Sequence, residues 1–82
     1  MKYEDIVNIV KYVLANHDSK EYITVILPSY AFSVQLNHIS GIEVLIDSLY
    51  IYCTDKCFIR CSFDKIEIIR LVKSQRDIKE YK

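Results

Sequence analysis

The feature that most constrains this fold is an alternation of side chains between residues 49 and 63. Two β-rich segments, Leu49–Cys53 and Cys57–Phe63, flank the polar triplet Thr54-Asp55-Lys56, which has the usual length of a hairpin loop. Because successive strand residues point to opposite faces, one face of this hairpin receives only apolar side chains: Leu49, Ile51, Cys53, Cys57, Ile59, Cys61 and Phe63. The other face receives Tyr50, Tyr52, Phe58, Arg60 and Ser62. A wholly apolar face has to be buried against a second layer.

The N-terminal segment supplies a helix that can form this second layer. Its apolar residues follow the i, i+3, i+4, i+7 spacing of a helical stripe: Tyr3, Ile6, Val7, Val10, Val13 and Leu14. Glu4 and Asp5 stand in the first turn, where carboxylates interact favourably with the helix dipole. The spacing predicts a helix over residues 2 to 16, and the polar residues 16 to 19 end it.

Residues 21 to 36 predict a first hairpin. The segment Glu21–Leu27 is short, β-branched and aromatic, Pro28-Ser29 can turn the chain, and Tyr30–Leu36 forms the second strand. Apart from Pro28 and the lysines, the predicted sheet edges carry few blocking residues. The addition of a strand from another chain is therefore physically available.

The three remaining segments show competing patterns. Residues 41 to 48 fit a short helix, with Ser40 and Glu43 as a capping box, and they equally fit a buried strand. In residues 65 to 72 four β-branched residues favour a strand, although Asp64 and Glu67 have the spacing of a helix cap. Residues 73 to 82 are expected to form a polar helical turn or a frayed tail.

The predicted fold class is α+β, a single domain over residues 1 to 82 in which the helix packs on a small antiparallel sheet. A helix followed by a small β-barrel is the alternative. At 82 residues the core is thin, and formation of a homodimer would stabilise it. One Gly and one Pro exclude glycine-rich phosphate loops and dinucleotide fingerprints, and neither G-x-S-x-G nor H-E-x-x-H occurs. We therefore expect no enzyme and no cofactor.

The three cysteines, Cys53, Cys57 and Cys61, have the spacing C-x3-C-x3-C. Zinc usually takes four ligands in closer pairs, and His17 and His38 are far away in the sequence. We expect no metal and reduced thiols that pack as small hydrophobic groups. The odd number of cysteines and the lack of a recognisable secretory signal favour the cytoplasm.

The longest uncharged stretch runs from residue 22 to residue 42. It contains Pro28, Gln35 and Asn37, which a spanning helix of about 20 residues does not readily carry. We expect no transmembrane span, and the pattern leaves peripheral contact with a membrane open.

Charge is divided unevenly along the chain. Residues 1 to 49 carry three basic against six acidic groups, whereas residues 50 to 82 carry eight basic against five acidic groups. Aromatic side chains beside cations are typical of surfaces on which single-stranded nucleic acid stacks. The corresponding set here is Tyr50, Tyr52, Phe58, Arg60, Lys65 and Arg70. The pattern does not decide whether the N-terminal helix covers the aromatic side chains.

Two segments resemble RNA-binding folds. The segment Lys56–Phe63 resembles the RNP1 box of RRM domains in its basic first position and its two aromatic residues, but it lacks both glycines and has Arg60 where an aromatic residue is usual. Residues 41 to 71, preceded by the helix, are similar to an Sm-like barrel, which implies the alternative β-barrel fold. Both resemblances are partial, and neither assigns the chain to a family.

We expect a small non-enzymatic protein that binds a protein partner, such as a regulator that inhibits or sequesters its target. The predicted binding surface is the large side chains of the second hairpin: Tyr50, Tyr52, Phe58 and Arg60. Thirteen Ile and seven Tyr indicate AT-rich codons, which is consistent with a phage or viral source. The alternative is an RNA or single-stranded nucleic-acid binding module. The net charge of 0 argues against it, because phosphate neutralisation needs a basic surplus.

Overall fold

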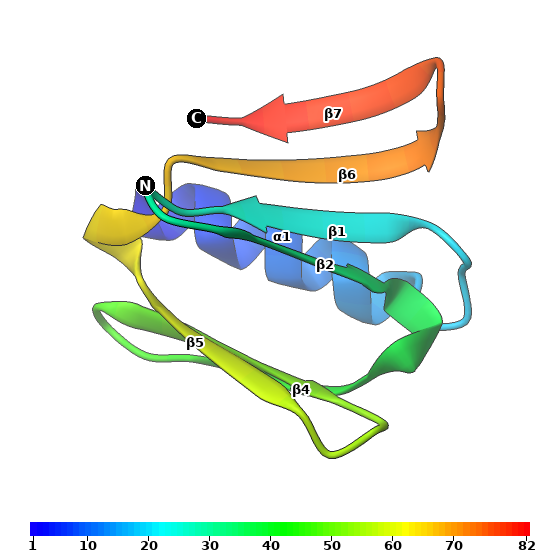
Figure 1. The fold of residues 1–82 in the computed structure, drawn as a ribbon, viewed down its shortest axis with the longest axis horizontal. Coiled ribbons are helices and arrows are strands. Elements are labelled where there is room, and N and C mark those ends of the chain that lie inside the picture. The colour runs from blue at the N-terminus through cyan, green and yellow to red at the C-terminus, as the bar shows by residue number, and fades with distance from the viewer.

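The computed structural model describes all residues from Met1 to Lys82, as one α-helix and two antiparallel sheets (Figure 1). The helix α1 spans Tyr3–Ala15. Sheet A has the order β2-β1-β6-β7, with bounds β1 Tyr22–Ile26, β2 Ala31–Gln35, β6 Ile68–Ser74 and β7 Asp77–Tyr81. Sheet B has the order β3-β4-β5, with bounds β3 Ile39–Val44, β4 Ser48–Cys53 and β5 Phe58–Ser62. Two 3-10 helices, η1 Leu36–His38 and η2 Phe63–Lys65, connect the sheets.

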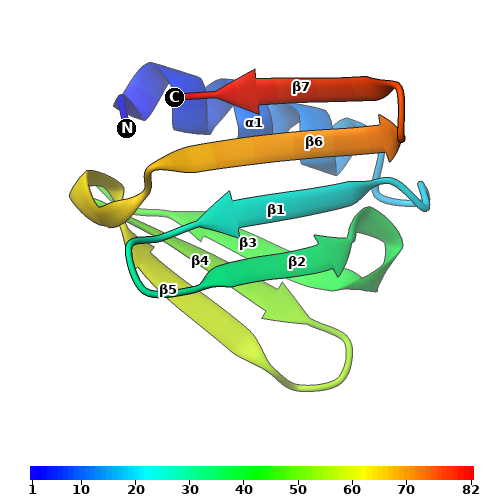
Figure 2. The same cartoon turned by 45° about the horizontal axis from the view of Figure 1, so that its top comes forward.

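Sheet A, sheet B and the helix enclose one hydrophobic core of 15 buried residues. Both views show the helix and sheet B on the same side of sheet A, with the helix behind β1 and β2 in Figure 1 and behind β6 and β7 in Figure 2. The inner faces of the strands supply every second residue, such as Ile23 and Val25 from β1 and Leu49 and Ile51 from β4. Full burial of each such side chain stabilises the fold by about 1.5 to 3 kcal/mol. The predicted α+β class is confirmed.

Helix α1 has nearly the predicted extent, but it buries a different stripe. Ile6, Ile9 and Val13 are buried, whereas Tyr3 and Leu14 are more than half exposed. The predicted buried stripe omitted Ile9 and wrongly included Tyr3 and Leu14. The reason is the place of the helix, which contacts β3 and packs against the core that the two sheets share, so that only the narrow stripe of Ile6, Ile9 and Val13 is enclosed.

The predicted first hairpin is confirmed. Strands β1 and β2 pair in antiparallel register, and the amide of Leu27 donates to the carbonyl oxygen of Tyr30 across the Pro28-Ser29 turn. Residues 65 to 72 also form the expected strand, β6, although it begins at Ile68 after the 3-10 turn η2.

The open choice over residues 41 to 48 falls to a strand. The strand β3 ends at Val44, and residues 45 to 47 form the turn into β4. Ile42 pairs with Ile51, and Val44 pairs with Leu49. In a strand, the side chains of Ile42 and Val44 therefore both extend the apolar inner face of sheet B. The capping-box pattern at Ser40 is therefore not used for a helix.

The prediction of a helical turn or frayed tail over residues 73 to 82 was wrong. Residues from Asp77 to Tyr81 form β7, which pairs with β6 from Ile69 to Ser74. Tyr81 and Lys79 lie opposite Ile69 and Leu71, on the inner side, and the other residues face solvent. The pairing partner, and not a strong intrinsic strand pattern, gives this polar segment its structure.

The two sheets do not close into the alternative β-barrel. Strands β2 and β5 stand at the edges of separate sheets and do not pair with each other. No helix of the structure combines the length and the hydropathy that crossing a bilayer requires.

Candidate functional site

The outer face of sheet B carries the four side chains of the predicted binding surface. Tyr50 lies directly opposite Arg60, and Tyr52 lies directly opposite Phe58, on the neighbouring strands β4 and β5. Directly opposite residues on antiparallel strands share a face and lie within contact distance. We call this set, Tyr50, Tyr52, Phe58 and Arg60, the aromatic face.

The three rings of the aromatic face form one continuous cluster. The ring centroids of Tyr50 and Tyr52 are 6.3 Å apart with the planes inclined by 21°, and those of Tyr52 and Phe58 are 5.8 Å apart. The guanidinium carbon of Arg60 lies 5.7 Å from the centroid of the Tyr50 ring, a cation–π distance. The cluster is therefore ordered by contacts among its own members.

Strand β3 adds two residues that the sequence analysis missed at this face. Gly41 is the register partner of Tyr52, and Glu43 is the register partner of Tyr50. The hydroxyl of Tyr52 donates a hydrogen bond of 2.8 Å to Oε1 of Glu43, and this bond raises the pKa of Tyr52. The alternation along residues 41 to 44 contained this information, but it could be used only once that segment was known to be a strand.

The aromatic face is uncovered. Phe58 is 60% exposed, Arg60 is exposed, and the rings of Tyr50 and Tyr52 are partly exposed. The opposite side of the same strands is packed into the core, together with the ridge of α1. The helix packs against the inner sides of the strands, so it does not cover the side chains of the aromatic face.

The two basic residues of the nucleic-acid set lie elsewhere. Lys65 stands in η2, and Arg70 lies on the outer side of β6 in sheet A, where its Nε is 2.6 Å from Oε1 of Glu80. Lys73, Arg76, Lys79 and Lys82 belong to the β6–β7 hairpin and its end, whereas Lys56 lies in the β4–β5 turn of sheet B. Six of the eight basic residues of the C-terminal half therefore lie outside sheet B, which carries only Lys56 and Arg60.

The cysteines do not share one environment. Cys53 and Cys61 are buried, and burial raises the pKa of both thiols, which lowers the thiolate fraction at neutral pH. Cys57 is exposed, so its predicted place on the buried face was wrong. Lys56, with a φ of 70°, forms the β4–β5 turn, and the amide of Cys53 donates to the carbonyl oxygen of Cys57 in the same register that pairs Tyr52 with Phe58. Cys57 is therefore still opposite Cys53, but it lies at the open end of the hairpin and lines a groove.

No three His, Cys, Asp or Glu side chains are close enough together to hold a metal ion. His17 is exposed after the end of α1, where Nδ1 lies 3.2 Å from the carbonyl oxygen of Leu14. His38 is exposed at the end of η1, directly before β3 begins.

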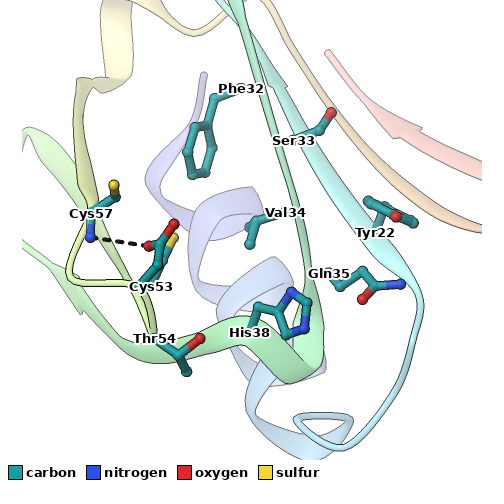
Figure 3. A pocket seen from close by; sticks show the side chains of 10 residues that line it. Tyr22, Phe32, Ser33, Val34, Gln35, His38, Cys53, Thr54 and Cys57 are labelled. Carbon is teal, nitrogen blue, oxygen red and sulfur yellow. Dashed lines mark hydrogen bonds between the residues drawn. The ribbon is translucent and has the colours of Figure 1, made fainter.

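A groove of about 570 Å³ lies between β2 and the β4–β5 turn (Figure 3). Its walls combine the apolar side chains of Phe32, Val34 and Cys53 with the polar side chains of His38 and Asp55. The groove joins segments about 20 residues apart, so the sequence alone gave no signal for it.

Comparison of the chain with models of protein families, with curated protein sequences and with solved structures finds no match. The function is therefore inferred from the geometry of the aromatic face and its surroundings.

Proposed function

We propose that this protein is a non-enzymatic binding module that recognises another protein through the aromatic face. One observation carries the proposal: three contacting aromatic rings and an arginine lie exposed on a sheet face that nothing in the chain covers. Tyr, Phe and Arg are enriched in protein interfaces, and large side chains with few rotatable bonds give contact area with a small loss of entropy.

The charge of the surface supports a protein partner over a nucleic acid. The carboxylate of Glu43 lies on the same face as the rings, where it would repel a phosphate backbone. Arg70, a member of the nucleic-acid set, is paired with Glu80 on the other sheet. Arg60 contacts the rings and Lys56 in the β4–β5 turn is the other basic residue of sheet B, whereas binding to nucleic acid generally depends on several cations.

A module that only binds acts by occupying a surface of its partner. This fits a regulator that inhibits or sequesters its target, and a phage or viral origin agrees with that role. The free thiols fit a reducing compartment such as the cytoplasm.

The test combines capture of a partner with a matched pair of substitutions. A photo-crosslinking residue at position 58 should trap one dominant protein in cells of the source organism, and purified partner should bind the wild-type chain. Tyr52→Ala should weaken this binding, while Ile78→Ala, which removes an exposed apolar side chain from sheet A, should leave it unchanged.

The alternative has a distinct result in the same assay. Binding of a random single-stranded RNA or DNA that falls steeply with salt, and that Tyr52→Ala abolishes, would overturn the proposal in favour of a nucleic-acid module.

A further inference from the structure

The groove of about 570 Å³ lies between the edge strand β2 of sheet A and the β4–β5 turn of sheet B, and no residue of the helix lines it. Helix α1 contacts β3, and its Tyr12 ring lies 5.9 Å from the ammonium group of Lys73, next to β7. In Figure 1, β2 crosses in front of the helix and the β4–β5 hairpin lies below it. The groove lies between β2 and the β4–β5 turn and exposes the partly buried side chains of Phe32 and Val34 (Figure 3).

Strand β2 has a free row of backbone donors and acceptors along this groove. The amide of Leu27 donates to the carbonyl oxygen of Tyr30, and the amide of Leu36 donates to the carbonyl oxygen of Glu21. These two bonds show which residues of β2 form hydrogen-bonded pairs with β1. Even-numbered residues of β2 thus bond to β1, and the backbone groups of the odd-numbered residues point outward: Ala31, Ser33 and Gln35. An added strand would find unpaired partners there.

The four sheet edges differ in how well they are protected against another strand. Strand β7 carries Asp77, Lys79 and Glu80, and Lys79 points inward, a common device against edge pairing. Strand β3 has an irregular register between Ile39 and Gly41, and it contacts the helix. Strand β5 carries the charged residue Arg60, whereas strand β2 has no charged residue and a regular register. Strand β2 is the least protected edge, and it is the edge that borders the groove.

We propose that the groove takes an extended segment of a partner protein, which adds a strand to the free edge of β2. Every second side chain of this segment points into the groove beside Phe32 and Val34, so these residues are apolar. This groove is a second binding site, separate from the aromatic face, and it shares no residue with that face.

Charge specifies one end of the occupant. Asp55 is the single carboxylate in the lining of the groove, and no Lys or Arg lines it. The amide of Thr54 bonds to the carbonyl oxygen of His38 at 2.9 Å, so the β4–β5 turn stands beside η1, at the Gln35 end of β2. The occupant therefore carries a basic residue where it passes this turn, and a carboxylate there is disfavoured.

The test uses labelled seven-residue peptides in which Val and Thr alternate, with Lys or Glu placed at either end. We expect saturable binding to the full chain, with the better Lys peptide bound about two- to five-fold more tightly than its Glu counterpart. Asp55→Asn should remove this difference, because asparagine can still accept the turn hydrogen bond from the amide of Cys57 but carries no charge.

A second pair of variants tests the backbone contact. Ser33→Pro removes an outward N–H and should weaken peptide binding by at least about ten-fold. Ser33→Ala is the control, since it loses only the 2.7 Å contact between the hydroxyl oxygens of Ser33 and Thr24 and should bind as the wild type does. The peptide can be N-methylated at alternate residues in two ways. Methylation of the amides that face β2 should abolish binding, whereas methylation of the amides that face away from β2 should not.

Three results would overturn the proposal. These are the absence of saturable binding by all four peptides, equal binding by the Ser33→Pro and Ser33→Ala variants, and a dimer of the free chain that Ser33→Pro dissociates. The last result would make a second copy the occupant. Tyr52→Ala should leave peptide binding intact, so failure here and failure of the aromatic face are separate outcomes.

Discussion

The outer faces of the two sheets are both uncovered, but they are built differently. On sheet A the polar groups pair with each other: Thr24 with Ser33 at 2.7 Å, and Arg70 with Glu80 at 2.6 Å. On sheet B the arginine has no carboxylate partner and rests on a tyrosine ring, beside a phenylalanine that is 60% exposed. The face of sheet A satisfies its own charges, whereas that of sheet B leaves a cation and apolar rings available to another molecule.

The largest expected effect separates the two sides of sheet B. Ile51 is fully buried on the inner side of β4, so Ile51→Ala should lower the free energy of unfolding by about 2 to 5 kcal/mol through lost contacts and a cavity. Such a loss is a large part of the roughly 5 to 15 kcal/mol that stabilises a typical domain. Urea denaturation measures it.

Phe58→Ala is the matched control on the outer side of the neighbouring strand. It should change the free energy of unfolding by about 1 kcal/mol or less, because most of its ring is already in water. Equal destabilisation by the two substitutions would mean that the aromatic face is structural, and the contrast between the two sides of sheet B would fail.

The second effect concerns binding. Tyr52 lies between Tyr50 and Phe58, so Tyr52→Ala should weaken binding of the partner by about 1 to 3 kcal/mol, while the melting temperature changes little. Ile78→Ala on sheet A should change neither quantity appreciably. Titration calorimetry and a thermal melt give both values. A large fall in melting temperature with no loss of affinity would contradict the proposed function.

The aromatic face shows how far sequence reasoning reaches here. Alternation along β4 and β5 was enough to group its four members, because strand geometry fixes which residues share a face. The exposure of that face was not predictable, since it depends on where α1 packs. The stripe of apolar residues in α1 allowed more than one orientation, and burial of Ile9 shows which one the two sheets select.

Two other features depended on contacts between distant segments. Strand β7 has a polar sequence and gains its structure from pairing with β6, so its local pattern was misleading. Cys57 keeps its place in the alternation opposite Cys53, but it lies at the end of the hairpin, where it lines the open groove beside β2 instead of the core. Whether a position on the inner face is covered depends on the neighbouring layer, which the pattern of apolar residues does not show.

A smaller effect tests the ion pair on sheet A. Arg70 and Glu80 are both more than a third exposed, so solvent screens their attraction. A double-mutant cycle of Arg70→Ala and Glu80→Ala should give a coupling of about 0.2 to 1 kcal/mol that falls with salt. Arg60→Ala should show no comparable coupling to any single carboxylate. A strong coupling between Arg60 and Glu43 would remove the difference between the two faces.

The smallest effect distinguishes two tyrosines that both bond to glutamates. Burial and the hydrogen bond to Glu21 raise the pKa of Tyr12 to about 12, whereas the bond to Glu43 is the main cause of the raised pKa of Tyr52. A raised phenol pKa favours the folded state while the phenol is protonated. The contribution of Tyr12 is therefore complete below pH 10 and is lost as the pH rises toward about 12.

Glu43→Gln should return the pKa of Tyr52 toward its ordinary value, because it removes the charged acceptor that is the main cause of the shift. Glu21→Gln should lower the pKa of Tyr12 only in part, since burial, its largest cause, remains. Tyrosinate absorbance, measured as the difference between each protein and its Tyr→Phe variant, follows the two phenols separately.

Because the Tyr52 bond is on the surface, a partner can replace Glu43 as its acceptor, so partner binding should also shift the titration of Tyr52 and leave that of Tyr12 unchanged. An unshifted Tyr52 in the complex would place the contact away from this hydroxyl.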